Sequence, residues 1–121
     1  MGDDLTQQII GAAIEVHREL GCGLLESIYE EALVHEFGIR GLPFARQWPV
    51  DVHYKGHIIK GQRLDLVVAN EVVVELKSLA KLPEIALAQV LSYLRASGLR
   101  RALIINFGEQ VLKNGIRRVS L

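Results

Sequence analysis

The stretch RLDLVVANEVVVELKS, residues 63–78, constrains the fold more than any other part of the chain. Valine and leucine dominate both halves, as is typical of strands, and Asn70 between them suits a turn with positive φ. A turn with an odd number of residues centred on Asn70 would place Val67 opposite Val73. The stretch therefore predicts an antiparallel pair of largely buried strands.

Three charged residues interrupt this apolar pattern: Asp65, Glu75 and Lys77. Alternate residues of a strand share a face, so Glu75 lies on the same face as Lys77, and the expected register places Asp65 opposite Glu75. Carboxylates on cross-strand neighbours, whose Cβ atoms are about 5 Å apart, repel each other unless a cation balances them. Lys77 supplies one positive charge, whereas Mg²⁺ or Mn²⁺ would balance both carboxylates and prefers oxygen ligands. An ordinary ion pair on a solvent-facing strand is the alternative.

The rest of the chain alternates between helical and strand patterns. Helices are expected at residues 6–20, with Thr6 as a possible cap, and at residues 25–37, where Gly38 ends the apolar pattern. Strands are expected at residues 47–54, 57–69, 72–77 and 102–107, a third helix at 83–97 and a short edge strand at 116–119. This order predicts one domain, residues 1–121, with an α/β architecture around one mixed sheet.

Composition excludes several classes of protein. Half of the residues are hydrophobic and 23% are charged, which argues against disorder. Cys22 is the only cysteine and the four histidines lack metal-ligand spacing, so a disulfide or a zinc site is not expected. The N-terminus does not resemble a signal peptide and no apolar run is long enough to span a membrane, which predicts a soluble, cytoplasmic protein.

Charge is unevenly distributed along the chain. Residues 1–76 carry 6 Lys and Arg against 12 Asp and Glu, whereas residues 77–121 carry 8 against 2. A basic final third is consistent with contact to a polyanion if the fold gathers its cations on one side, and otherwise with a solvated polar rim.

Two further residue pairs have the spacing of a shared helix face. Gln89 and Tyr93 are four residues apart on the expected third helix, where they could position a water molecule and a phosphate. Glu26 and Tyr29 are three residues apart near the start of the second helix. Taken alone, each pair also fits a structural role, with the tyrosines in the core and Glu26 near the positive end of the helix dipole.

Together these residues resemble a known family. GLLESIY at residues 23–29 resembles the signature of the GxxExxY proteins, a small group assigned to the PD-(D/E)xK nuclease superfamily. Asp65 followed by ELK at residues 75–77 resembles the Asp…Glu-x-Lys core of that superfamily, and QVLSY at residues 89–93 resembles the Gln-x-x-x-Tyr motif of its exonuclease-like branch. The sequence departs from the superfamily pattern at Leu64, where a proline often precedes the aspartate.

The resemblance implies a restriction-endonuclease-like fold and a metal-dependent nuclease that hydrolyses phosphodiester bonds, with DNA as the expected substrate. It implies that Asp65 and Glu75 ligate Mg²⁺ or Mn²⁺. The backbone carbonyl of Leu76 would be a further ligand, and Glu26 would approach the ion directly or through water.

By the same resemblance, Lys77 would activate the attacking water, and Gln89 and Tyr93 would hold the phosphate or the water. Contacts to nucleic-acid phosphates near the site are expected from Lys81, Arg95, Arg100 and Arg101. A homodimer would enlarge the small binding surface. The competing interpretation is a catalytically inactive binding or assembly module built on the same fold.

Overall fold

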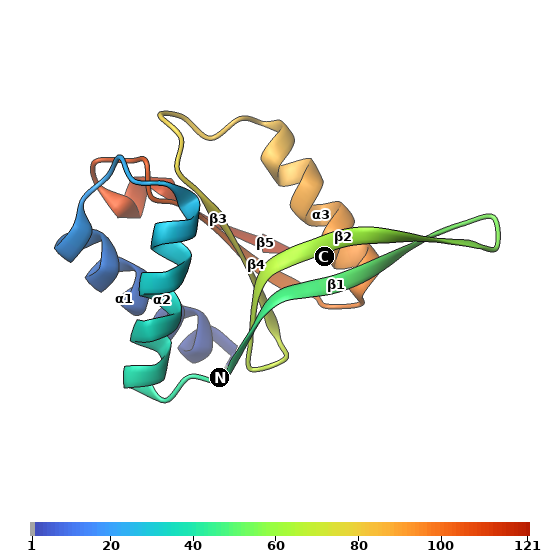
Figure 1. Cartoon of the computed structure of the whole chain (residues 1–121), viewed down its shortest axis with the longest axis horizontal. Coiled ribbons are helices and arrows are strands. Elements are labelled where there is room, and N and C mark those ends of the chain that lie inside the picture. The colour runs from blue at the N-terminus through green and yellow to red at the C-terminus, as the bar shows by residue number, and fades with distance from the viewer. Residues whose placement is uncertain (1) are drawn as a thin grey trace.

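The computed structural model describes the backbone of residues 2–121 and the side chains of residues 4–121. Within that range the chain forms three α-helices, five strands and one short 3₁₀ turn (Figure 1). In chain order these are α1 (Gly2–Leu20), α2 (Glu26–Arg40), β1 (Phe44–Tyr54), β2 (His57–Val68), β3 (Val72–Lys77), α3 (Ile85–Ser97), β4 (Arg101–Asn106), η1 (Leu112–Gly115) and β5 (Ile116–Ser120). The expected order of elements is confirmed, and the mixed sheet is consistent with a restriction-endonuclease-like fold.

The strands lie in the order β1-β2-β3-β4-β5 across one sheet. β1, β2 and β3 form an antiparallel meander, and Val67 pairs with Val73 as expected. β4 is parallel to β3 and antiparallel to β5. A parallel neighbour needs a crossover connection, which α3 provides between β3 and β4.

Two hydrophobic clusters fill the two faces of the sheet. The first core lies between the sheet and helices α1 and α2, and the second core lies under α3 (Figure 1). Leu103 and Ile105 of β4 face the first core, whereas Ala102 and Ile104 face the second. The continuous apolar run in this strand is therefore explained by burial on both faces.

The β1–β2 hairpin extends well beyond the helices (Figure 1). Its turn is Lys55-Gly56, as expected, and both residues have positive φ, 50° and 81°. We call residues 51–63, the outer part of this hairpin, the arm.

The boundaries of the first two helices differ from expectation. α1 begins at Gly2, so Thr6 lies inside the helix, where its buried hydroxyl accepts a hydrogen bond from Arg118 Nη1 at 2.8 Å rather than capping the helix. α2 continues through Gly38 to Arg40, and Gly41 ends it in the left-handed conformation with a φ of 72°. The N–H of Gly41 donates to the Gly38 carbonyl, which closes the last turn.

Two further elements begin at different residues than expected. β1 starts at Phe44 instead of residue 47, because its pairing with β2 continues to Val68. α3 starts at Ile85, and Pro83 lies in the turn that precedes the helix. None of the helices in the described part of the chain is long and apolar enough to cross a membrane.

Candidate active site

The site is built where β2 and β3 separate. Their ladder ends at the Leu66–Val74 pair, and beyond it carboxylates take the place of backbone partners. Asp65 Oδ2 accepts a hydrogen bond from the Leu76 N–H at 2.8 Å, and the Asp65 N–H donates to Glu75 Oε1 at 3.4 Å. We call this point the fork. It brings the two carboxylates together, in agreement with the register read from the sequence.

Burial raises the pKa of both carboxyl groups. Only 6% of Glu75 is exposed, and burial followed by repulsion from Asp65 raises its pKa to about 7. The pKa of Asp65 is also raised, first by burial and then by the charge of Glu30, although the Leu76 N–H acts in the opposite direction. The fork therefore contains two carboxyl groups that lack enough positive charge to balance them.

Lys77 and Glu26 border the fork from different elements. Lys77 ends β3, and its charge lowers the pKa of both Asp65 and Glu75. Glu26 is the first residue of α2, and its pKa is raised by burial, lowered by Lys77 and raised by Asp65. These mutual effects place Glu26 in the electrostatic environment of the fork, although its side chain remains accessible to solvent.

Tyr29 fixes the loop that leads to Glu26. The Tyr29 ring is fully buried and stacks on Phe107, with 4.4 Å between ring centroids. Its hydroxyl donates to the Gly21 carbonyl at 2.5 Å and accepts from the Leu24 N–H at 3.2 Å. Tyr29 is thus a core residue, as its apolar position suggested, that also holds the start of α2 in place.

A second contact ties this loop to the end of β3. The Ser78 hydroxyl donates to the carbonyl of Leu24 at 2.5 Å, one residue beyond Lys77. The α1–α2 loop and the last residues of β3 are therefore held against each other next to the fork.

α3 covers the face of the sheet opposite α1 and α2, and it brings Tyr93 to the carboxylates. Tyr93 is half-buried, and burial together with the charges of Glu75 and Asp65 raises its pKa. Gln89 lies one helical turn earlier on the same face and is exposed. The structure thus places Tyr93 in the electrostatic environment of the fork, whereas Gln89 is an exposed residue one turn earlier on the same helix.

Glu30 is an acidic neighbour of the fork that the sequence did not single out. It is 9% exposed and accepts hydrogen bonds from Arg46 Nε at 2.9 Å and Gln47 Nε2 at 3.2 Å. Its charge raises the pKa of Asp65 and of Glu26. The only sequence signal was its spacing of four residues from Glu26, which places both on one helix face.

The basic residues expected to bind phosphate are spread over the molecule. Lys81 lies in the exposed β3–α3 connection, which leaves the sheet at the Lys77 end. Arg101 pairs with Val72 at the opposite end of β3, about 16 Å from Lys77 at the usual rise per strand residue. Exposed Arg100 precedes β4 at that same far end, whereas exposed Arg95 lies in the last turn of α3, two residues after Tyr93. The expectation that all four lie near the fork is therefore not met, because β4 runs parallel to β3.

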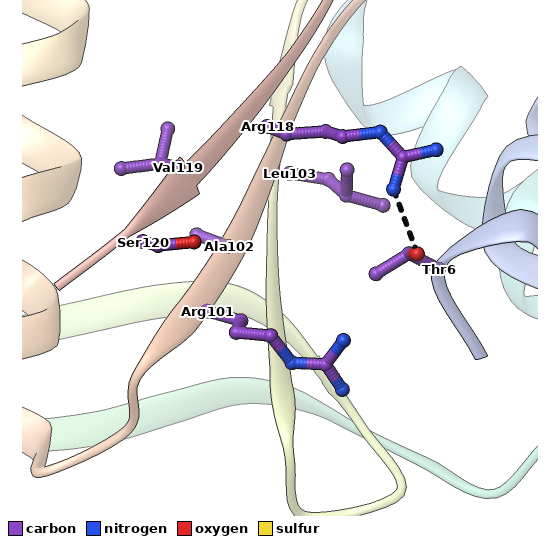
Figure 2. Close-up of a pocket in the computed structure, with 7 residues that line it drawn as sticks. All are labelled: Thr6, Arg101, Ala102, Leu103, Arg118, Val119 and Ser120. Carbon is purple, nitrogen blue, oxygen red and sulfur yellow. Dashed lines mark hydrogen bonds between the residues drawn. The ribbon is translucent and has the colours of Figure 1, made fainter. Parts of the chain in front are cut away.

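Arg101 also points away from the fork. Its Nη2 donates to Glu71 Oε1 at 2.8 Å. With Arg118 and Thr6 it lines a pocket of about 80 Å³ beside α1, and both guanidinium groups extend toward that helix (Figure 2).

The fork offers oxygen donors of the kind that Mg²⁺ and Mn²⁺ prefer. In an extended strand the N–H and C=O of one residue point to the same edge, so the Leu76 carbonyl faces Asp65 as its N–H does. Among the described residues, no group of three or more His, Cys, Asp or Glu side chains is arranged to hold a metal ion. The donors that fit such an ion are therefore the two carboxylates and one backbone carbonyl.

Comparison with known proteins places the chain in a family. Neither a curated protein nor a solved structure matches it. The family model of the PD-(D/E)XK nuclease superfamily matches residues 3–119, which include the fork, the start of α2 and all of α3. Asp65, Glu75 and Lys77 all lie within the matched residues. They occur in the same order as the aspartate, the second acidic residue and the lysine in the family's name. The chain belongs to the PD-(D/E)XK nuclease superfamily.

Proposed function

We propose that the protein is a metal-dependent nuclease that hydrolyses phosphodiester bonds of DNA. The observation that carries this proposal is the pair of buried carboxylates at the fork, which bond to backbone N–H groups where the ladder of β2 and β3 ends. Two adjacent carboxylates with raised pKa are costly to keep without a cation. Their presence together with Lys77 favours catalysis over a purely structural role.

Asp65, Glu75 and the Leu76 carbonyl would hold Mg²⁺ or Mn²⁺, and Glu26 would reach the ion through water. When bound, such an ion neutralises negative charge on the phosphate and increases the acidity of water. The carboxylates would orient that water toward the phosphorus, because they lie on neighbouring strands whose positions the sheet fixes.

The remaining residues act on the phosphate and the water. Lys77 donates a hydrogen bond to the attacking water or to a phosphate oxygen and offsets the charge that develops in the transition state. Tyr93 donates from its hydroxyl to a phosphate oxygen; a tyrosine is already protonated at neutral pH, and the raised pKa of Tyr93 only adds to this. Gln89, one turn away, orients the phosphate or the water.

Other features of the proposal rest on the sequence. The GLLESIY segment supports membership of the GxxExxY group, and Tyr29 in that segment positions Glu26. Cytoplasmic location and a homodimer remain predictions. Of the four cations expected to contact phosphate, Lys81 lies at the end of β3 that bears Lys77 and is therefore the best candidate to contact DNA near the fork.

The test combines metal binding with cleavage. Mn²⁺ is titrated calorimetrically into the wild type and the Asp65→Ala/Glu75→Ala variant, and nicking of plasmid DNA is measured on the same samples. We expect the wild type to bind Mn²⁺ and nick the plasmid, and the variant to do neither. A wild type that binds no metal contradicts the proposal, and so does cleavage that persists in the variant.

A second candidate is an inactive binding module that retains the nuclease fold. The net charge of zero, which gives the chain little overall attraction for a polyanion, favours this candidate. It predicts that nucleic acid binds without Mg²⁺ and that no cleavage follows when Mg²⁺ is added. The same plasmid assay with and without Mg²⁺ therefore separates the two functions.

A further inference from the structure

The arm carries an exposed surface that the fork does not use. Val52 pairs with Ile59 and Tyr54 with His57, so these side chains share one face of the hairpin. That face continues from Val50, which is buried in the second core, out past the end of α3 (Figure 1). Tyr54 is 59% exposed and Ile59 is 45% exposed.

The arm is also basic. Lys55, Lys60 and Arg63 stand against a single acidic residue, Asp51, which pairs with Lys60 at 2.9 Å. Lys55 Nζ lies 5.5 Å from the centroid of the Tyr54 ring, so a cation and an aromatic ring sit together at the tip. A partner for this surface must have negative charge and flat apolar groups.

Nucleic acid with unpaired bases has both properties. Each base presents a π-face to an aromatic side chain, and each nucleotide adds a phosphate that a lysine or arginine can contact. A protein partner would cover Val52 and Ile59 equally well, but it would not account for a lysine beside an exposed ring at the tip of a basic arm.

The arm and the fork lie on one continuous strand. Arg63 precedes Asp65 by two residues on β2, and His57, opposite Tyr54, precedes it by eight. At the usual rise per residue the tip of the arm is roughly 26 Å from Asp65. A nucleic-acid strand that is bound at the fork can therefore continue along the arm.

We infer that the arm binds a single-stranded part of the substrate, with a base stacked on Tyr54 and a phosphate contacted by Lys55. This inference rests on the proposed nuclease function and extends it to a substrate class, nucleic acid with an unpaired stretch that lies roughly 26 Å from the cleaved bond.

The test measures binding apart from cleavage. Tyr54 is changed to Ala, Leu and Phe in the Glu75→Gln background, which prevents hydrolysis during the measurement. Affinity is determined by fluorescence anisotropy for a single-stranded DNA of about 20 nucleotides, longer than the usual site of one binding domain, and for a blunt duplex of the same length. Ile39→Ala, at a 68% exposed position on α2, is the matched control.

If a base stacks on Tyr54, the variants should differ in a specific way. Tyr54→Ala and Tyr54→Leu weaken single-strand binding by about 5- to 100-fold, whereas Tyr54→Phe and Ile39→Ala retain it. Lys55→Ala lowers the salt dependence of log K by about 0.7, the value for one phosphate contact on a single strand. Lys113→Ala, at an exposed position on η1, leaves that dependence unchanged.

Several results would overturn the inference. Unchanged affinity in Tyr54→Ala would do so and leave the nuclease proposal intact, since that is judged by the metal and plasmid experiment. An equal loss on the blunt duplex, or full retention of binding by Tyr54→Leu, would exclude stacking on an unpaired base. Sedimentation velocity covers the remaining case: if Tyr54→Ala turns a dimer into monomers of unchanged affinity, the arm joins two copies of the chain instead.

Discussion

Glu75 has an unusual position for a carboxyl group, because only 6% of it is exposed and Asp65 lies beside it. Its proton is held to a pKa of about 7, compared with 4.5 for an ordinary glutamate. A group whose pKa is higher in the folded protein favours folding at low pH and loses that contribution as pH rises through the folded value. The free energy of unfolding of the metal-free protein therefore decreases as the pH rises from about 4.5 to about 7.

Replacing the Glu75 carboxylate by a neutral amide should prevent this loss of stability at high pH. We expect Glu75→Gln to stabilise the metal-free protein by about 1–3 kcal/mol near pH 8, with little effect near pH 4.5. Urea denaturation at both pH values measures the difference. Glu19→Gln, at an exposed position of α1, is the control and should change stability at neither pH. A gain of equal size at both pH values would contradict this explanation.

The same proton competes with a metal ion. Because a carboxylate must lose its proton to bind a metal, Mn²⁺ affinity should fall by up to about tenfold per pH unit below 7 and level off above it. Calorimetry in two buffers of different ionisation enthalpy would show proton release near pH 6.5 and little near pH 8. Affinity independent of pH across this range would mean that Glu75 is not a ligand.

Sequence patterns were sufficient to predict that Asp65 and Glu75 are neighbours, because strand alternation and the turn at Asn70 are local features. They were insufficient for Glu30, which depends on how α2 docks against β1 through Arg46 and Gln47. Nothing in the spacing of two glutamates indicates which strand supplies the partners. The acidic surroundings of the fork are thus a product of tertiary structure.

Helix ends show the same division between local and tertiary effects. Gly38 ends the apolar pattern of α2, yet the helix continues for two residues and terminates at Gly41, which adopts the positive φ that glycine tolerates best. The predicted start of α1 was wrong for a related reason. Thr6 resembles a cap in the sequence, but it is a buried residue bonded to Arg118, 112 residues away.

Gly38 in α2 and Gly41, which follows its last residue, should respond in opposite ways to substitution by alanine. At Gly38 an added Cβ has no heavy atom within 4 Å, so Gly38→Ala should stabilise the protein by about 0.4–1 kcal/mol by favouring the helix. Gly41→Ala should destabilise it by about 1 kcal/mol, because its φ of 72° strains any L side chain. Thermal or urea denaturation compares the two. Stabilisation by both substitutions would show that Gly41 does not hold the left-handed conformation.

At the scale of the whole molecule, the sheet separates two cores and the fork lies between the helices that cover them. Residues from α2, β2, β3 and α3 meet there. The order of elements was predictable because each has a clear period, but the distribution of the basic residues was not. It follows from the parallel register of β3 and β4, which carries Arg101 away from Lys77.

Metal binding should therefore be visible in global stability. A ligand that binds only the folded state at about 100 times its Kd adds about 2.7 kcal/mol to the free energy of unfolding. We expect Mn²⁺ to raise the Tm of the wild type by several degrees and to leave that of Asp65→Ala/Glu75→Ala unchanged. An excess of chelator should remove the effect, and an equal shift in both proteins would assign the metal to another site.

The hydrogen bond between the Leu76 N–H and Asp65 Oδ2 gives the fork its own spectroscopic reporter. The chemical shift of one backbone amide proton depends on the charge of the oxygen that accepts it, so the Leu76 signal should follow the protonation of a side chain eleven residues away in sequence. Nuclear magnetic resonance of a ¹⁵N-labelled sample can therefore monitor the state of the carboxylate pair without any substrate.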